Sequence, residues 1–325
     1  MNKTLHCTIF LAILLLLVCA LTWLFLPKNN TYEDGIHDFL REGYLSEPEN
    51  SLEVVFLGDS IPFYGICPPV IWQEQGIPSF VCAGKAKALP YTVSYLKSFL
   101  RRQTPKLVVL ETNVLYHELT DRKRFDAAME EYFPLYIYHD NWKMCNPKRM
   151  LQPFHFEADT WEKGYLMRKH SLPYSGGAYM LPSSDEEPVP EISIPYFQQL
   201  LSLCQQHNAT LMLLSIPSAT NMSTPRHNAL ERFAASYGLE YLDLNQCPQI
   251  DIDWSHDTLD RGDHLNWWGA EKASKFLAAY LMDTGLFSDR REDPSYQKWN
   301  ETSDSFMNLV AESWGYTEEN VHLFK

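Results

Sequence analysis

The sequence predicts an apolar N-terminal helix followed by one large α/β domain, which consists of a parallel sheet with helices on both faces. Short apolar runs of strand length alternate with longer helical segments, the pattern of consecutive β-α-β units. Small or polar residues follow several of these runs, and parallel sheets hold their ligands beyond the carboxyl ends of the strands. An uncharged run of twenty residues near the start predicts the N-terminal helix.

The N-terminal run, Cys7 to Leu26, is long enough to cross the roughly 30 Å hydrocarbon core of a bilayer as a helix. Lys3 precedes it, so the positive-inside tendency predicts a single-pass protein of the cell membrane, with everything after Lys28 outside the cytoplasm. A cleaved signal peptide is the alternative, with Val18-Cys19-Ala20 as its cleavage site. The run exceeds the usual length of a signal core, which favours a retained anchor.

We expect three parts: a tail and anchor at residues 1–28, the α/β domain at 29–288 and a helical extension at 289–325. Candidate strands are residues 52–57, 79–82, 106–110, 210–215 and 239–243, and candidate helices are 92–102, 196–207, 224–237 and 269–284. In the extension, helix-like spacing is clearest around residues 305–313.

Residues 118–190 interrupt the alternation and are too many for a simple connection. We expect an insertion that lies over the strand ends and shapes a donor or acceptor site. Tyr136, Tyr138 and Trp142 are flat side chains on which sugars could stack, although aromatic residues more often pack a small core of their own. His139 and His155 are candidate ligands or acids, but lone histidines seldom are.

A serine stands at the end of the first candidate strand, in Gly58-Asp59-Ser60. A serine hydroxyl is a poor nucleophile until a histidine accepts its proton. Glycine suits a sharp strand-to-helix turn, and the first N–H groups of the following helix can face a developing oxyanion. Alone, however, these three residues equally describe an ordinary loop.

A histidine follows much later, in Asp263-His264-Leu265-Asn266 at the start of a helix-like segment. His264 is the candidate general base, and Asn266 is expected to brace the loop. The alternative is a helix cap with a solvated histidine. Together, Ser60 and His264 indicate serine chemistry on an ester.

These residues resemble the SGNH/GDSL hydrolase superfamily, and within it a membrane-anchored bacterial branch akin to the alginate O-acetylation proteins and the D-alanyl transfer protein DltD. The resemblance runs from about Leu52 to the C-terminus. It is carried by Gly58-Asp59-Ser60, by the segment from Asp263 to Lys272, and by Phe133 to His139 and Asp289 to Pro294. It implies a flavodoxin-like three-layer α/β/α sandwich with Ser60 as nucleophile, and an oxyanion hole of the Ser60 N–H, Gly84 and Asn113.

The two further oxyanion residues each follow a candidate strand. Asn113 comes after the run Lys106 to Leu110, where a parallel strand would deliver an amide side chain, and the alternative is a turn asparagine. Gly84 comes after residues 79–82 and could equally be a turn glycine with positive φ.

The acid of the triad departs from the superfamily pattern. The resemblance implies an aspartate three residues before the histidine, and that position is Arg261. Asp260 could serve if the loop holds one extra residue, whereas Asp263 would need an unusual backbone to reach its neighbour's Nδ1. We prefer Asp260, and a dyad without an acid stays open.

Composition excludes several other functions. The net charge of −14 argues against binding nucleic acid or an acidic membrane surface through a broad basic face. Five cysteines follow the anchor without CxxC spacing, so they indicate neither a disulfide framework nor a zinc site, although one pair could bridge: Cys67, Cys82, Cys145, Cys204 and Cys247. No phosphate loop, dinucleotide fingerprint or HExxH segment is present, so we expect no cofactor and no metal.

The expected function is that of a membrane-anchored extracytoplasmic esterase or O-acyltransferase acting on acyl esters of a cell-surface polysaccharide. The resemblance also implies a membrane-bound O-acyltransferase as partner. The alternative is a catalytically inactive glycan-binding or assembly protein that kept the fold while its acid drifted.

Overall fold

The chain forms two compact units, of which the larger carries the sheet. The structure is a computed structural model of the whole chain and describes residues 3–31, 36, 38, 40–143, 146–157 and 161–312. Described residues within 40–119 and 159–312 form the larger unit, and those within 1–39 and 120–157 form the smaller one. The expected insertion at 118–190 is thus divided between the two units.

Among the described residues, five strands form one parallel sheet in the order β2-β1-β3-β4-β5. They are β1 (Val54–Gly58), β2 (Ser79–Ala83), β3 (Leu107–Glu111), β4 (Thr210–Ser215) and β5 (Glu240–Asp243). This is the flavodoxin-like, doubly wound order. β1, β2 and β3 are completely buried and apolar except for Ser79 and Glu111, as expected for parallel strands that are covered on both faces.

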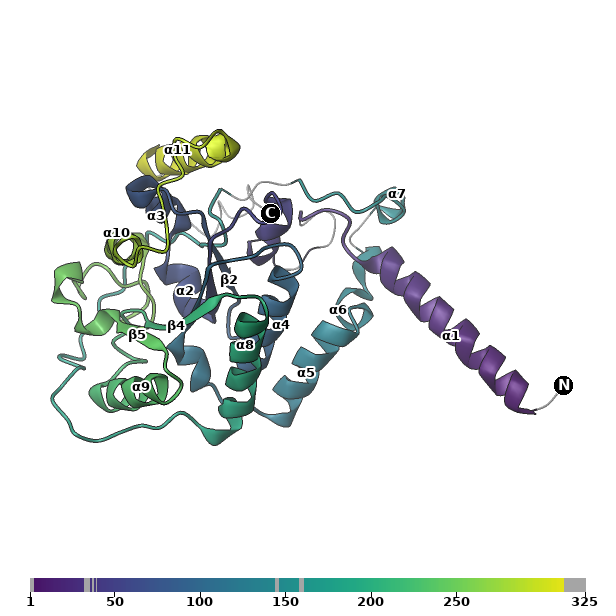
Figure 1. Cartoon of the computed structure of the whole chain (residues 1–325), viewed down its shortest axis with the longest axis horizontal. Coiled ribbons are helices and arrows are strands. Elements are labelled where there is room, and N and C mark those ends of the chain that lie inside the picture. Colours follow the sequence, from purple (N-terminus) through teal and green to yellow (C-terminus); the bar gives the residue numbers. More distant parts are fainter. Residues whose placement is uncertain are drawn as a thin grey trace. The chain divides into compact units, whose positions relative to one another are not determined.

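Helices cover both faces of the sheet (Figure 1). α4 (Leu89–Phe99), α8 (Ile194–Gln206) and α9 (Thr224–Ser236) lie on one side, and α2 (Ser60–Gly65), α3 (Pro68–Gln75) and α10 (Trp267–Asp283) lie on the other. α11 (Gln297–Glu312) packs on α3 and α10, where its Phe306 contacts a buried cluster that includes Trp267 and Tyr165. The prediction of an α/β fold with a parallel sheet is confirmed.

The carboxyl ends of β1, β2 and β3 lie level with one another. Gly58 pairs with Ala83 of β2, and Leu57 pairs with Leu110 of β3. The residue after each of these strands therefore emerges at the same edge of the sheet. This register brings the segments that hold Ser60, Gly84 and Asn113 to one place.

Gly58 makes the turn from β1 into α2 possible, because any side chain there would collide with its neighbours. A Cβ atom would lie 2.8 Å from Pro62 Cγ and 3.0 Å from Glu111 Cβ, and φ is +157°. We expect Gly58→Ala to lower the free energy of unfolding by about 3 kcal/mol, through overpacking, as measured by urea denaturation.

The control for this variant is Gly238→Ala, where φ is +65° but nothing lies within 4 Å of the added Cβ. This variant tests only the cost of placing a non-glycine residue at positive φ, and it should lower the free energy of unfolding by about 1 kcal/mol. Equal losses in the two variants would contradict the steric explanation.

The smaller unit is built around the N-terminal helix, α1 (Lys3–Phe25). Of the described helices, α1 alone is long and apolar enough to cross a membrane, and none of its residues is buried. It packs with α6 (Leu135–Tyr138), which follows α5 (Asp121–Tyr132) and precedes α7 (Pro147–Met150). Asn141 Nδ2 donates to the carbonyl oxygen of Phe25 at 2.9 Å and so ties this segment to the end of α1.

The rest of the expected insertion, residues 161–190, belongs to the larger unit and contains no regular helix or strand among its described residues. It is fastened to β2 by Lys163, whose carbonyl oxygen accepts from the Val81 N–H at 3.0 Å. The Lys163 ammonium forms a buried ion pair with Glu47 at 2.7 Å. That the insertion lies over the strand ends stays a prediction.

The described cysteines are free thiols, so no disulfide joins Cys67, Cys82, Cys204 or Cys247. Cys145 lies outside the described residues.

Candidate active site

Ser60 is the first residue of α2, directly after the turn that leaves β1. Asp59 caps this helix, and its Oδ1 accepts from the Ile61 N–H at 2.8 Å. The side chain of Ser60 is half-buried rather than enclosed. The hydroxyl is therefore presented at the edge of the sheet at which β1, β2 and β3 end.

His264 lies against Ser60. Its Nε2 is 2.8 Å from Ser60 Oγ, which is hydrogen-bond distance for a nucleophile and its base. The ring of Tyr64 packs edge-on against the imidazole, with centroids 5.1 Å apart. The structure thus brings together two residues that are far apart in the sequence.

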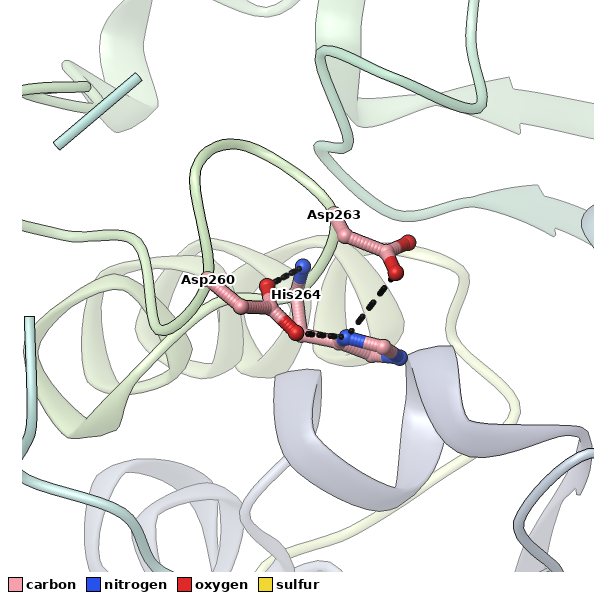
Figure 2. Close-up of side chains that lie close together, drawn as sticks. All are labelled: Asp260, Asp263 and His264. Atoms are coloured by element: carbon pink, nitrogen blue, oxygen red, sulfur yellow. Dashed lines mark hydrogen bonds and ion pairs between the residues drawn. The ribbon is translucent and has the colours of Figure 1, made fainter. Parts of the chain in front are cut away.

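Both candidate acids lie near the other ring nitrogen, but they contact it differently (Figure 2). Asp260 Oδ2 is 2.7 Å from His264 Nδ1, and its Oδ1 accepts from the backbone N–H of His264 at 2.7 Å. Asp263 Oδ2 is 3.5 Å from the same Nδ1. Asp260 is therefore the hydrogen-bonded partner of the imidazole, and Asp263 is a nearby charge.

The loop between Asp260 and His264 explains the unusual spacing. Arg261 and Gly262 both have left-handed backbone, with φ of +64° and +92°. The Leu259 N–H donates to the carbonyl oxygen of His264 at 2.9 Å, which closes the loop across its base. The tight turn absorbs the extra residue and returns Asp260 to the imidazole.

Asn266 stabilises this loop through hydrogen bonds of its side chain. It is completely buried and caps α10 by accepting from the Gly269 N–H, while its Nδ2 donates to the carbonyl oxygen of His256 at 2.6 Å. On the other side, Ser218 Oγ donates to the carbonyl oxygen of Asp263 at 2.7 Å. The loop that carries the histidine is thus held by Asn266, which follows it directly, and by Ser218 from the segment after β4.

The electrostatics of the site favour a charged aspartate and a basic imidazole. Burial opposes ionisation of Asp260, but hydrogen bonds from the ring and backbone of His264 outweigh it and lower the pKa of the carboxyl. Burial likewise opposes protonation of His264, but the hydrogen bond to Asp260 and the charge of Asp263 outweigh it and raise the pKa of the imidazole.

The raised pKa of His264 predicts how activity depends on pH. A general base must be neutral, so kcat/KM should fall as pH drops through this pKa, with a midpoint above 6.5. Asp263→Asn removes a charge that raises the pKa, so it should move the midpoint to lower pH. Asp283→Asn, at the exposed end of α10, is the control and should leave it in place. A midpoint that rises in Asp263→Asn would contradict this assignment.

Asn113 lies in the 3₁₀ turn that follows β3. Its Nδ2 donates to Asp59 Oδ2 at 2.8 Å, and its Oδ1 accepts from Arg226 Nη1 at 3.4 Å. An amide nitrogen carries two hydrogens, so the bond to Asp59 leaves the second for an oxyanion. Asp59 and Arg226 together fix the orientation of this amide.

Gly84 follows β2 directly, one residue beyond the pair of Gly58 and Ala83. Its φ is not positive, contrary to the turn-glycine alternative. An added Cβ would lie 2.9 Å from Lys87 Cγ and 3.2 Å from Tyr95 Oη, which gives a steric reason for glycine. No hydrogen bond described for the chain joins Gly84 to Ser60, so its contribution to an oxyanion hole stays a prediction.

Sequence reasoning missed three residues at the site. His117 Nε2 lies 2.5 Å from Asp59 Oδ2, so the residue before the nucleophile has its own histidine partner. Arg226 stacks on Tyr116 and reaches Asn113. Asn221 Nδ2 donates to Asp263. The one available signal was the position of His117, four residues after Asn113.

Asp260, Asp263 and His264 also lie close enough together to hold a metal ion. The nitrogen ligand would be Nδ1 of His264, since Nε2 faces Ser60. Because a carboxylate on Nδ1 is what a serine triad requires, this cluster does not by itself favour a metal.

No protein-family model and no curated protein matches the sequence. Among solved structures, the chain is similar to one from Bacteroides fragilis NCTC 9343 that is described as a "putative acylhydrolase". The identity is 11% and the TM-score 0.41, over 78% of this chain and 98% of the other. We therefore argue function from the geometry of the site rather than from this likeness.

Proposed function

We propose that this chain is a serine esterase or O-acyltransferase of the SGNH type, anchored in the membrane by α1. One observation carries the proposal: Ser60 Oγ, His264 and Asp260 form a continuous hydrogen-bonded series, with steps of 2.8 and 2.7 Å. Such a series activates a hydroxyl towards an acyl carbonyl.

In the proposed reaction, Ser60 Oγ attacks the carbonyl carbon of an ester while His264 Nε2 accepts the hydroxyl proton. The tetrahedral oxyanion receives hydrogen bonds from the Ser60 N–H, Gly84 and the free N–H of Asn113. His264 then gives its proton to the leaving alkoxide, and the acyl group stays on Ser60. Water or a sugar hydroxyl takes the acyl group in the second half.

The resemblance to the branch of alginate O-acetylation proteins and DltD supports a cell-surface polysaccharide as substrate and a membrane-bound O-acyltransferase as partner. α1 is compatible with a domain held outside the cytoplasm. The irregular acid spacing was the reason to consider an inactive glycan-binding or assembly protein. That reason weakens because the left-handed turn at Arg261 and Gly262 brings Asp260 to the imidazole.

The test is to trap the acyl-enzyme. The full chain in detergent would be mixed with p-nitrophenyl acetate, quenched in acid and analysed by mass spectrometry for an acetyl group on the peptide that contains Ser60. An adduct that is absent from Ser60→Ala supports the proposal. No adduct with acetyl, succinyl or longer acyl donors would favour the binding protein.

Asn113 offers a separate test of the oxyanion hole. We expect Asn113→Ala to lower kcat by about 10²-fold with little change in KM, because one preorganised donor is lost only from the transition state. Asn228→Ala is the control, because it removes a half-buried amide of α9 that donates to the carbonyl oxygens of Ser183 and Asp185 and has no bond to Ser60, His264 or Asn113. A loss confined to KM would instead assign Asn113 to substrate binding.

A further inference from the structure

A cavity of about 300 Å³ lies in the smaller unit, just past the end of α1. Its lining includes Lys28, Asn29, Arg149, Gln152, His155 and Glu157. These residues come from the segment that leaves α1 and from the one that follows the start of α7. Nothing in the proposed ester chemistry uses them.

Backbone contacts hold the two walls of this cavity together. The His155 N–H donates to the carbonyl oxygen of Lys28 at 2.7 Å. The Glu157 N–H donates to Asn29 Oδ1 at 3.1 Å. The cavity is therefore built on the residues that emerge directly from the apolar helix.

The lining is mainly basic. Lys28 and Arg149 are cationic, and His155 pairs with the one acidic residue, Glu157, at 2.8 Å. The Lys28 ammonium lies 3.9 Å over the ring of Trp23 and 4.2 Å over the ring of Phe154. Burial lowers the pKa of Lys28, a cost that an anion in the cavity would offset.

Exposed apolar side chains stand close to these basic residues in the chain. Leu151 is 67% exposed and Phe154 43% exposed, and both neighbour cavity residues in the chain. Trp142 is 61% exposed, next to Asn141, which bonds the end of α1. Aromatic and basic residues at the end of an apolar helix are typical of the headgroup layer of a membrane.

We propose that this cavity binds the phosphate of an anionic phospholipid headgroup where α1 leaves the bilayer. Arg149 would pair with the phosphate, and Lys28, whose ammonium also donates to the carbonyl oxygen of Trp23, would add a second positive charge. Asn29 and Gln152 would donate to the remaining headgroup oxygens. Leu151 and Phe154 would contact the upper acyl chains. The inference needs α1 as a membrane helix but does not depend on the esterase proposal.

The experiment uses the full chain in a neutral detergent. Native mass spectrometry would follow the binding of dioleoylphosphatidylglycerol, dioleoylphosphatidylcholine and, in a separate arm, inorganic phosphate. We expect the anionic lipid to bind tighter than the zwitterionic one. Arg149→Gln should weaken the anionic lipid by about fivefold, the share of one basic residue near an anionic surface.

Lys148→Gln is the matched control, because Lys148 precedes Arg149 and is also exposed but does not line the cavity. Arg149 is the first choice for mutation since it is exposed, whereas Lys28 is only 4% exposed. Equal binding of the two lipids, or equal losses in Arg149→Gln and Lys148→Gln, would overturn the proposal. Phosphate alone binding as tightly as the anionic lipid would assign the cavity to a free anion and also overturn it.

Discussion

Ser60→Ala and His264→Ala should each lower the kcat for p-nitrophenyl acetate by about 10⁴-fold or more, and the double variant should be no worse than either single one. The two side chains act as one unit, since Ser60 Oγ is activated only through the proton that His264 Nε2 accepts at 2.8 Å. Initial rates of the full chain in detergent, measured with saturating substrate, check this directly.

His256→Ala is the matched control for the histidine. His256 belongs to the same region and also pairs with an aspartate, Asp257 at 2.9 Å, but it stacks on Trp268 instead of facing a serine. Its variant should keep at least half of the activity. If Ser60→Ala retained most of the turnover, hydrolysis would come from another group, and the proposed nucleophile would be wrong.

The sheet could be predicted closely because β1 to β4 are largely apolar and buried. Residues 210–215 are the strand β4 as predicted, and the other four strands differ from the prediction by one or two residues at one or both ends. The sequence also indicated which edge of the sheet carries the site, because the residues that follow parallel strands in register lie together.

The helices α8, α9 and α10 were predicted to within two residues at each end, and the other helices less well, for local reasons. The helix expected at 92–102 begins at Leu89 instead, because Pro90 is tolerated in a first turn, and it ends at Phe99. A helix was expected to follow Ser60, but no range was predicted for α2 or α3, since both are short, contain prolines and bury most of their residues. α11 begins eight residues before the predicted 305, and Ser313 lies outside the described residues.

At the candidate site, residue types were predictable and their contacts were not. Ser60, His264 and Asn113 stand at chain positions that a parallel sheet brings to one edge. The contacts of Asp59 with His117 and of Arg226 with Asn113 depend on how α9 and the turn after β3 pack, which no local pattern encodes.

Asp260→Asn should cost about 10³-fold in kcat, because it would place the wrong proton on the imidazole. Asp260 Oδ1 accepts from the His264 backbone N–H, so the amide oxygen of an asparagine would keep that position. Its NH₂ would then face Nδ1 and force the ring to accept there, which puts the hydrogen on Nε2. An imidazole with N–H towards Ser60 cannot take the hydroxyl proton.

Asp263→Asn is the matched comparison, since Asp263 lies 3.5 Å from the same nitrogen and makes no backbone bond to His264. It should lower kcat by less than tenfold on the alkaline plateau of the pH profile, where its effect on the imidazole pKa no longer matters. The larger loss in Asp263→Asn would make Asp263 the acid, and small losses in both would indicate a dyad. The comparison shows which carboxylate fixes the tautomer of the His264 imidazole, because a negative charge that only lies near the ring does not select one tautomer over the other.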